Sequence, residues 1–197
     1  MSLNKKFENL CIYLIGSMED DQFAEKHFLD TENSFHKAGV VRVINPCKQE
    51  QEKVGATVCI AQGMINKMRA LKQDEKVDRL YEKIWQIDAE NVREADILVA
   101  NIVKQSTSGT TLEGTLSNLC TIMDRITEYL DVKDREEYHR TIRPWLKRVG
   151  WQKPVFCITG NKTMINGTFI HALVRASGGR CFTSVGKLIR YLKKVYK

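Results

Sequence analysis

Five short apolar runs, separated by longer amphipathic segments, constrain the fold of this 197-residue chain more than any other feature. The first four runs lack a regular alternation of apolar and polar residues, as expected of strands that are covered on both faces. Strands that alternate with helices predict a parallel sheet with right-handed crossovers. We therefore expect an α/β fold whose doubly wound, five-stranded sheet is flavodoxin-like or Rossmann-like, with strand order 2-1-3-4-5. The runs are "LCIYLI" (10–15), "VVRVIN" (40–45), "DILVANIV" (96–103), "PVFCIT" (154–159) and "GRCFTS" (179–184).

Helical patterns lie between these runs. One of them stops at Gly39, which is a good helix-ending residue. The longest spans 74–96 and is expected to turn an apolar side toward the sheet. The expected helices cover 20–39, 74–96, 110–131, 164–179 and 184–196, and the inner side of the longest carries Val77, Leu80, Ile84, Ile87 and Val92. We expect one α/β domain over 1–197, with insertions near 46–75 and 124–152.

The cysteines and histidines of the chain indicate neither structural disulfides nor a metal site. None of the six cysteines forms a C-x-x-C pair, and several lie in apolar runs, where a thiol behaves as a small hydrophobic group. We expect buried, reduced thiols and a cytoplasmic location. The four histidines lack metal-ligand spacing, so no metal and no cofactor are expected. No run approaches the roughly 20 apolar residues of a membrane span, so we expect a soluble protein without a membrane partner.

The net charge of +7 is concentrated near the C-terminus, in "GKLIRYLKKVYK" (186–197). The pattern favours a solvated terminal helix whose cations interact with its C-terminal dipole. A contact with nucleic acid or another anionic surface is the less favoured alternative. The basic charge also suits a small phosphorylated ligand.

Ligands of open parallel sheets bind beyond the carboxyl ends of the strands, where the strand order reverses. In the expected order this point lies between the first strand and the strand at 96–103. The segments that follow them are "GSMEDD" (16–21) and "KQSTSGTTLEGT" (104–115). The second is rich in hydroxyl groups and begins a helix, where free N–H groups favour anions. Alternatively, Thr110-x-x-Glu113 is simply a capping box.

Two further acids lie near the strand at 96–103. Asp88 is on the edge of the apolar stripe of the long helix, where a solvated position is the default expectation. Asp96, at the strand entrance, is expected to be a polar group of the helix end or strand start rather than a catalyst.

Three sequence blocks together resemble the nucleoside 2-deoxyribosyltransferase superfamily, which includes transferases and nucleoside 5′-monophosphate N-glycosidases. The blocks are "CIYLIGSM" (11–18), "IDAENVREADILVAN" (87–101) and "GTTLEGTLSN" (109–118). They occur in the order and spacing that the family shows after its strands, and they are spread over about half of the chain.

The resemblance implies a role for each matched residue. Glu113 would be the nucleophile that attacks the anomeric carbon of the sugar, and Tyr13 would orient its carboxylate. Asp88 would contact the base or sugar and help proton transfer to the departing base. These roles agree with general glycoside chemistry, in which a carboxylate and a proton donor serve an oxocarbenium-like transition state.

One departure from the family pattern favours a phosphorylated substrate. Family members that use free nucleosides place an aspartate about six residues before the nucleophile, whereas this chain has Ser106–Thr107–Ser108 there. A carboxylate would repel a phosphate, and hydroxyl groups would bind it. The resemblance thus implies that the 5′-phosphate is bound around Gly16, Ser17, Thr107, Ser108 and Gly109, and that Ser117 reaches the phosphate of a neighbouring subunit.

The favoured function at this point is a nucleoside 5′-monophosphate N-glycosidase that acts as a homodimer on a small nucleotide. Gly114 and Thr115 stand where the family often has an apolar residue and glycine. A base-exchanging deoxyribosyltransferase is one alternative, and a non-catalytic nucleotide-binding protein on the same scaffold is another.

Overall fold

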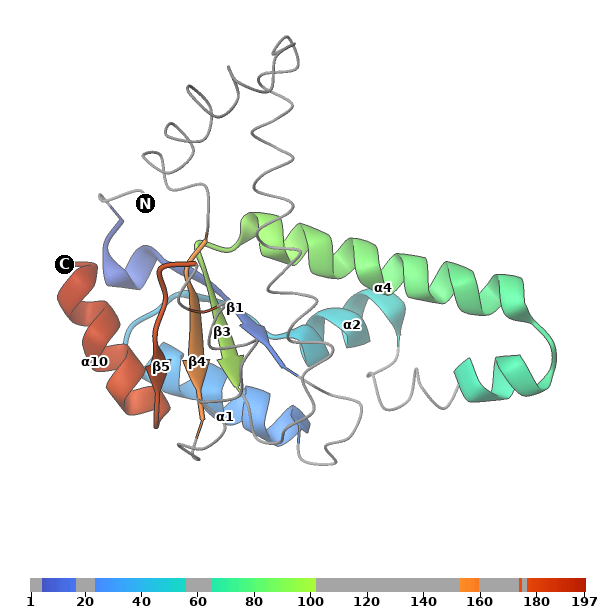
Figure 1. Ribbon diagram of the computed structural model, residues 1–197, viewed down its shortest axis with the longest axis horizontal. Helices are drawn as coiled ribbons and strands as arrows, with labels where there is room; N and C mark the ends of the chain where they lie inside the picture. Colours follow the sequence, from blue (N-terminus) through green and yellow to red (C-terminus); the bar gives the residue numbers. More distant parts are fainter. Residues whose placement is uncertain (1–4, 17–23, 56–64, 102–152, 160–173, 175–176) are drawn as a thin grey trace, which may run out of the picture.

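A computed structural model describes residues 5–16, 24–55, 65–101, 153–159, 174 and 177–197 (Figure 1). Its centre is a five-stranded sheet in which every neighbouring pair is parallel, in the order β2-β1-β3-β4-β5. This is the predicted doubly wound order, and it defines a flavodoxin-like or Rossmann-like α/β fold. The strands are β1 (Cys11–Ile15), β2 (Arg42–Ile44), β3 (Ile97–Asn101), β4 (Val155–Ile158) and β5 (Cys181–Phe182).

Each strand lies inside one of the five apolar runs, and the three central strands are buried on both faces. Alternate side chains of β1 enter two separate cores. Ile12 and Leu14 pack on the face that carries α1 (Ala24–Lys37) and α10 (Val185–Val195). Tyr13 and Ile15 pack on the opposite face. That face is covered by α4 (Asp74–Glu94), and α2 (Pro46–Val54) contacts both α4 and β1.

The two helices on the first face follow the sequence pattern. In α1, Phe28 and Phe35 are almost completely buried against the sheet, and the turn that follows places Gly39 at a φ of 107°. In α10, Leu188 and Leu192 are fully buried, while the cations of the helix point outward. The predicted helices at 20–39 and 184–196 are therefore confirmed over their described residues.

The predicted insertion at 46–75 contains a regular helix, α2, which was not predicted from the sequence. Asn45 caps it by accepting a hydrogen bond from the Cys47 amide at 3.1 Å, and Pro46 follows at the first helical position. This pairing of an N-cap asparagine with proline is a known helix-start signal.

A buried carboxylate joins α1 to α2. Glu32 accepts hydrogen bonds from the Asn45 side-chain amide at 2.8 Å and from Lys48 Nζ at 2.7 Å. Burial alone would raise the pKa of Glu32, but these two hydrogen bonds and the electrostatic effects of Lys48 and His36 together outweigh it, so the pKa lies below its ordinary value. The charged form of Glu32 is therefore stabilised in the folded protein.

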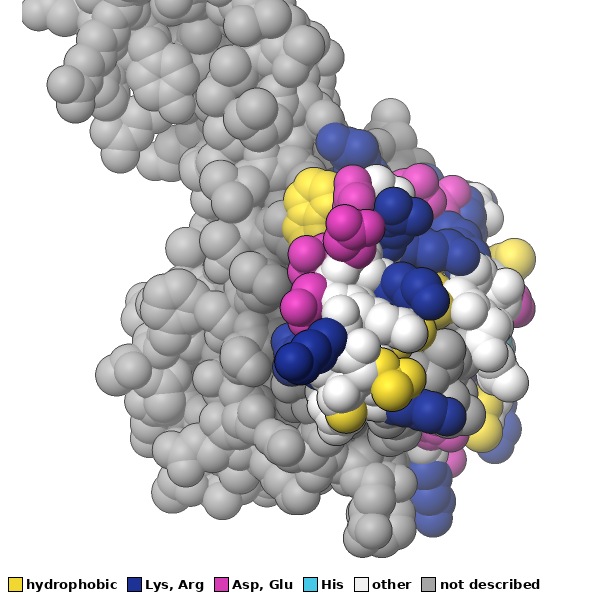
Figure 2. All heavy atoms as spheres, turned by 90° about the vertical axis from the view of Figure 1, so that its right-hand side faces the viewer, with side chains coloured by type: hydrophobic (Ala, Val, Ile, Leu, Met, Phe, Trp, Pro, Cys, Tyr) yellow, Lys and Arg dark blue, Asp and Glu magenta, His cyan; other side chains and the backbone are white. Residues whose placement is uncertain are grey.

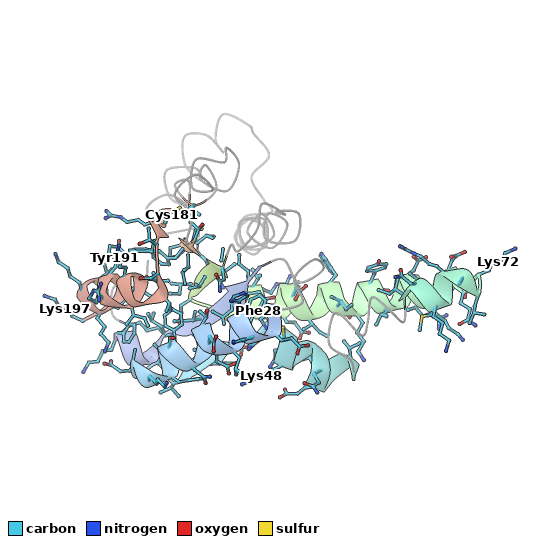
Figure 3. The ribbon with its side chains drawn as sticks, turned by 90° about the horizontal axis from the view of Figure 1, so that it is seen from below. Phe28, Lys48, Lys72, Cys181, Tyr191 and Lys197 are labelled. Atoms are coloured by element: carbon cyan, nitrogen blue, oxygen red, sulfur yellow. The ribbon has the colours of Figure 1, made fainter. Side chains whose placement is uncertain are left out.

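The long helix α4 spans 21 residues, or about 31 Å, and extends well beyond the sheet. In its C-terminal half, Ile87 and Val92 are buried as predicted. Val77 is buried as well, whereas Leu80 and Ile84, which were expected on the same inner side, are only half-buried. In Figure 3, Lys72, which precedes the N-terminus of α4, and Lys197 lie at opposite ends of the molecule.

The face at the far end of α4 carries charges of both signs. Figure 2 shows Lys and Arg side chains interspersed with Asp and Glu, and only isolated hydrophobic groups among them. The first two turns of α4 alone contribute Asp74, Glu75, Lys76, Asp78 and Arg79. Such a mixture is typical of a solvated helix surface.

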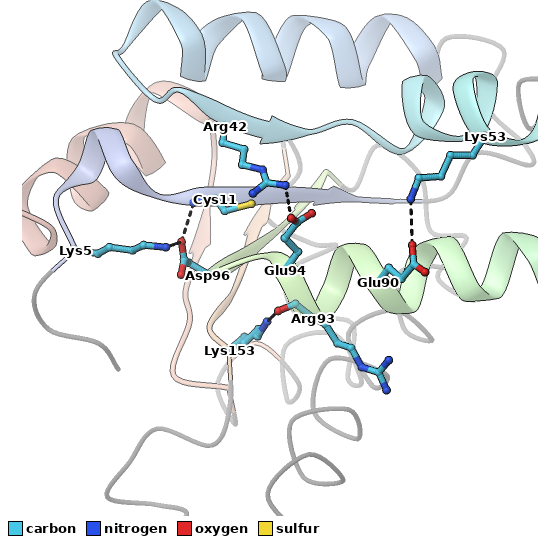
Figure 4. A network of polar contacts seen from close by, with 9 residues as sticks. All are labelled: Lys5, Cys11, Arg42, Lys53, Glu90, Arg93, Glu94, Asp96 and Lys153. Carbon is cyan, nitrogen blue, oxygen red and sulfur yellow. Dashed lines mark hydrogen bonds and ion pairs between the residues drawn. The ribbon is translucent and has the colours of Figure 1, made fainter.

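Polar contacts fix the chain around the start of β3 (Figure 4). Asp96 accepts hydrogen bonds from the Cys11 amide at 2.8 Å and from Lys5 Nζ at 2.5 Å. Lys153 donates to the carbonyl groups of Val92 and Arg93 at the C-terminal end of α4. The prediction that Asp96 is a structural group at the strand entrance is thus confirmed.

Candidate functional site

Tyr13 occupies the middle of β1, an inner strand that lies between β2 and β3, and is completely buried. Strand alternation turns its side chain toward the face that α4 covers, because Cys11 and Ile15 point the same way. A buried phenol usually forms a hydrogen bond, since an unsatisfied hydroxyl group is costly away from water.

The Tyr13 hydroxyl donates a hydrogen bond to Asp88 Oδ1 on α4, with an oxygen–oxygen distance of 2.9 Å. The neighbouring residues Ile87 and Ala89 are buried, which fixes the rotation of this part of the helix. Asp88 is therefore half-buried and turned toward the sheet rather than fully solvated. Two of the three residues expected to carry the chemistry are in direct contact.

The surroundings of Asp88 change its acidity. Burial raises the pKa of Asp88 to about 6, and the hydrogen bond from Tyr13 opposes part of this increase. Burial disfavours the charged carboxylate, whereas the phenolic donor favours it. A carboxyl group with a pKa near 6 can both donate and accept a proton near neutral pH, which is the property that general acid–base catalysis requires.

Gly16 lies directly after β1, beside the point where the strand order reverses. A Cβ atom at this position would lie 3.1 Å from the carbonyl oxygen of Asn101, at the end of β3, and 3.1 Å from Cζ of Phe28. The carboxyl ends of β1 and β3 and the helix α1 therefore approach each other closely here. Gly16 thus lies at the carboxyl end of the sheet, where the ligand is predicted to bind, and its lack of a side chain permits this close approach.

Asn101 is a polar residue at the same carboxyl end of the sheet, and it was not among the site residues predicted from the sequence. Its side-chain amide donates to Thr31 Oγ1 on α1 at 3.3 Å, and Thr31 also donates to the carbonyl group of His27 at 2.8 Å. The signal that could have identified Asn101 is its place as the polar residue that ends the apolar stretch "ILVAN". Asn101 lies where a ligand is expected to bind, because it ends a strand next to the point where the strand order reverses.

The other predicted site residues lie outside the residues that the structure describes. They are Glu113, Ser17, Thr107, Ser108, Gly109 and Ser117. Their roles as nucleophile and phosphate ligands remain predictions. The structure brings together Tyr13 and Asp88, and it places Gly16 at the end of the same strand as Tyr13.

Within the described ranges, no three His, Cys, Asp or Glu side chains form a group that could hold a metal ion. None of the described helices is both long enough and apolar enough to cross a membrane.

The described residues thus define a doubly wound, parallel α/β protein in which a buried tyrosine of β1 is hydrogen-bonded to a half-buried aspartate of α4. No protein-family model, no curated protein and no solved structure matches this chain.

Proposed function

We propose that this protein is a nucleoside 5′-monophosphate N-glycosidase that releases the free base and a (deoxy)ribose 5-phosphate. The observation that carries the proposal is the hydrogen bond between Tyr13 and Asp88, because two of the three family-like sequence blocks meet there. The third block contains Glu113, the proposed nucleophile, and it follows β3, the neighbour of β1 in the sheet.

The acidity of Asp88 suits the role of proton donor to the departing base. With a pKa of about 6, a useful fraction of Asp88 is protonated near neutral pH. A protonated Asp88 needs the phenolic hydrogen less than a carboxylate does, so Tyr13 can donate to a second acceptor while Asp88 keeps its own hydrogen for the departing base. Protonation of Asp88 would in this way allow Tyr13 to orient the carboxylate of Glu113.

The hydroxyl-bearing residues that follow β1 and β3 in the sequence support a phosphorylated substrate. Ser17 directly follows Gly16, and Thr107 and Ser108 precede the nucleophile in a stretch that is predicted to be a turn and has no acidic residues. Hydroxyl groups and backbone amides of such a turn can donate to the 5′-phosphate, and no carboxylate within 104–112 opposes it.

The proposed N-glycosidase would be a homodimer in the cytoplasm. A homodimer would allow Ser117 to reach the phosphate in the neighbouring subunit, and sedimentation of the purified protein tests this. A cytoplasmic location fits a nucleotide substrate, and it fits the free thiols of Cys11 and Cys157.

The decisive experiment incubates wild type and Glu113→Gln with a panel of nucleoside monophosphates and nucleosides and measures the released base by chromatography. We expect release from monophosphates by the wild type and a loss of at least about a hundredfold in the variant. Glu82→Gln, on the exposed surface of α4, is the matched control and should retain full activity.

Two other outcomes would replace the proposal. If an added free base is incorporated into a new nucleoside, the protein is a base-exchanging deoxyribosyltransferase. If the protein binds nucleotides over long incubations without releasing base, it is a non-catalytic nucleotide-binding protein.

A further inference from the structure

Cys157 and Cys181 are direct partners across the parallel pair β4–β5. Both thiols are free, and both side chains lie on the sheet face that α4 covers. The residues next to them, Phe156 and Phe182, point to the opposite face, where their ring centroids are 6.3 Å apart. The two cysteines therefore share one face because in-register residues of parallel strands point the same way.

The backbone around this pair holds the two strands in register. The Cys157 amide donates to the Arg180 carbonyl at 3.0 Å, and the Thr159 amide donates to the Phe182 carbonyl at 2.9 Å. Just before β5, Gly179 approaches β4 so closely that a Cβ atom there would lie 1.8 Å from the Val155 carbonyl oxygen. Neighbouring strands are about 4.8 Å apart, which lies within the Cα separations that disulfides span.

The two thiols differ in exposure and in acidity. Cys157 is buried, whereas Cys181 is half-buried because β5 is the edge strand. All thiols were predicted to be buried, and the partial exposure of Cys181 differs from that prediction. The interaction between the two thiols, together with burial, raises the pKa of Cys157, and the same interaction lowers the pKa of Cys181. The more accessible sulfur is thus the one that more readily forms the nucleophilic thiolate.

We propose that Cys157 and Cys181 form a reversible, peroxide-sensitive dithiol site at the edge of the sheet. The Cys181 thiolate attacks the O–O bond of a hydroperoxide, which gives a sulfenic acid and, after protonation of the leaving oxygen, water or an alcohol. The Cys157 thiol then attacks the Cys181 sulfur, forms the disulfide and releases water. The two thiols are oxidised, and the peroxide is reduced. Exchange with an external thiol restores the dithiol.

The test treats the reduced, folded wild-type protein with hydrogen peroxide and then alkylates the remaining thiols in denaturant. We expect the intact mass to fall by two hydrogen atoms and two of the six thiols to escape alkylation. Peptide mapping under non-reducing conditions should show the peptides of Cys157 and Cys181 linked to each other. Dithiothreitol should restore all six alkylation sites.

Variants separate this pair from the other cysteines. Cys181→Ser should prevent the loss of two alkylation sites, whereas Cys47→Ser, in the buried first turn of α2, should leave the Cys157–Cys181 link intact. The mapping uses the wild-type protein, so it stands even if a variant fails to fold. Linkage to other cysteines, or a Cys181 sulfinic acid beside an alkylatable Cys157, would overturn the proposal.

Discussion

Tyr13 and Asp88 are 75 positions apart in the chain, and their side-chain oxygens lie 2.9 Å apart in the fold. The contact joins the inner strand β1 to α4, the helix that covers one face of the sheet. It also places a carboxyl group where burial and a phenolic donor act on its acidity in opposite directions. Both effects lead to measurable consequences for stability and for proton transfer.

Asp88→Asn should make the protein more stable at neutral and alkaline pH. The folded-state pKa of Asp88, about 6, lies above the unfolded value of 3.8, so its stabilising contribution is complete below about pH 4 and is lost as the pH rises through 6. Asparagine stays neutral and can still accept from Tyr13. We expect a gain of about 1–2 kcal/mol at pH 8 that disappears near pH 4, measured by urea unfolding.

The matched control for this measurement is Asp78→Asn, on the exposed side of α4, which should show no comparable dependence on pH. An Asp88→Asn variant that is less stable than the wild type at pH 8 would contradict the expectation.

Tyr13→Phe should move the titration of Asp88 to higher pH. The phenol lowers the pKa of Asp88, so its removal should raise that pKa above about 6. Carbon NMR of labelled aspartate carboxyl groups measures this directly. If Asp88 donates the proton to the leaving base, kcat/KM falls as the pH rises through the same value, and the fall shifts with the variant.

Tyr81→Phe, on the same helix but 40% exposed, is the matched control and should leave the titration of Asp88 unchanged. An unchanged Asp88 titration in Tyr13→Phe would show that the hydrogen bond does not set its acidity.

Gly16→Ala should destabilise the fold by about 1–2 kcal/mol, because the added methyl group would meet the Asn101 carbonyl group and the ring of Phe28 at 3.1 Å. Gly186→Ala provides the contrast, since a Cβ atom there meets nothing within 4 Å and the position is helical. That variant should be stabilised by about 0.5–1 kcal/mol. Thermal unfolding of both proteins measures the difference, and equal effects of one sign would refute the steric explanation.

Asn45→Ala should cost about 2–3 kcal/mol, because it removes the cap of α2 and one hydrogen-bond donor to the buried Glu32 carboxylate. The pKa of Glu32 is lowered in the fold, so its contribution is present above the unfolded value of 4.5 and is lost as the pH falls below it. The cost should therefore shrink in acid, as urea unfolding at several pH values would show.

Gln51→Ala, at an exposed position of α2, is the control and should change stability little at any pH. A cost of Asn45→Ala that stays the same from neutral to strongly acidic pH would assign the whole effect to the helix cap.

The sheet could be predicted from the sequence because its signal is local. Apolar runs bounded by polar segments identified all five strands, and the flavodoxin-like pattern of doubly wound sheets gave their order. The rotation of α4 was harder to predict, because it depends on packing that no local pattern records. Ala89 and Asn91 are buried, whereas Leu80 and Ile84 are only half-buried.

The candidate site could be predicted only in part. From its position in the helix alone, Asp88 was expected to be solvated, and only the family resemblance related it to Tyr13. The contact depends on where a strand and a helix meet in space, and sequence periodicity does not contain this information. The thiol pair was not predicted for the same reason, since Cys157 and Cys181 become neighbours only through the register of β4 and β5.

The lengths of the outer strands affect how the protein behaves at high concentration. The sheet ends in β2, with three residues, and in β5, with two. Unpaired backbone groups at a sheet edge can recruit strands from other molecules, and short edges present few of them. During refolding, the described sheet therefore offers little template for intermolecular β-aggregation, even though its central strands are among the most apolar segments of the chain.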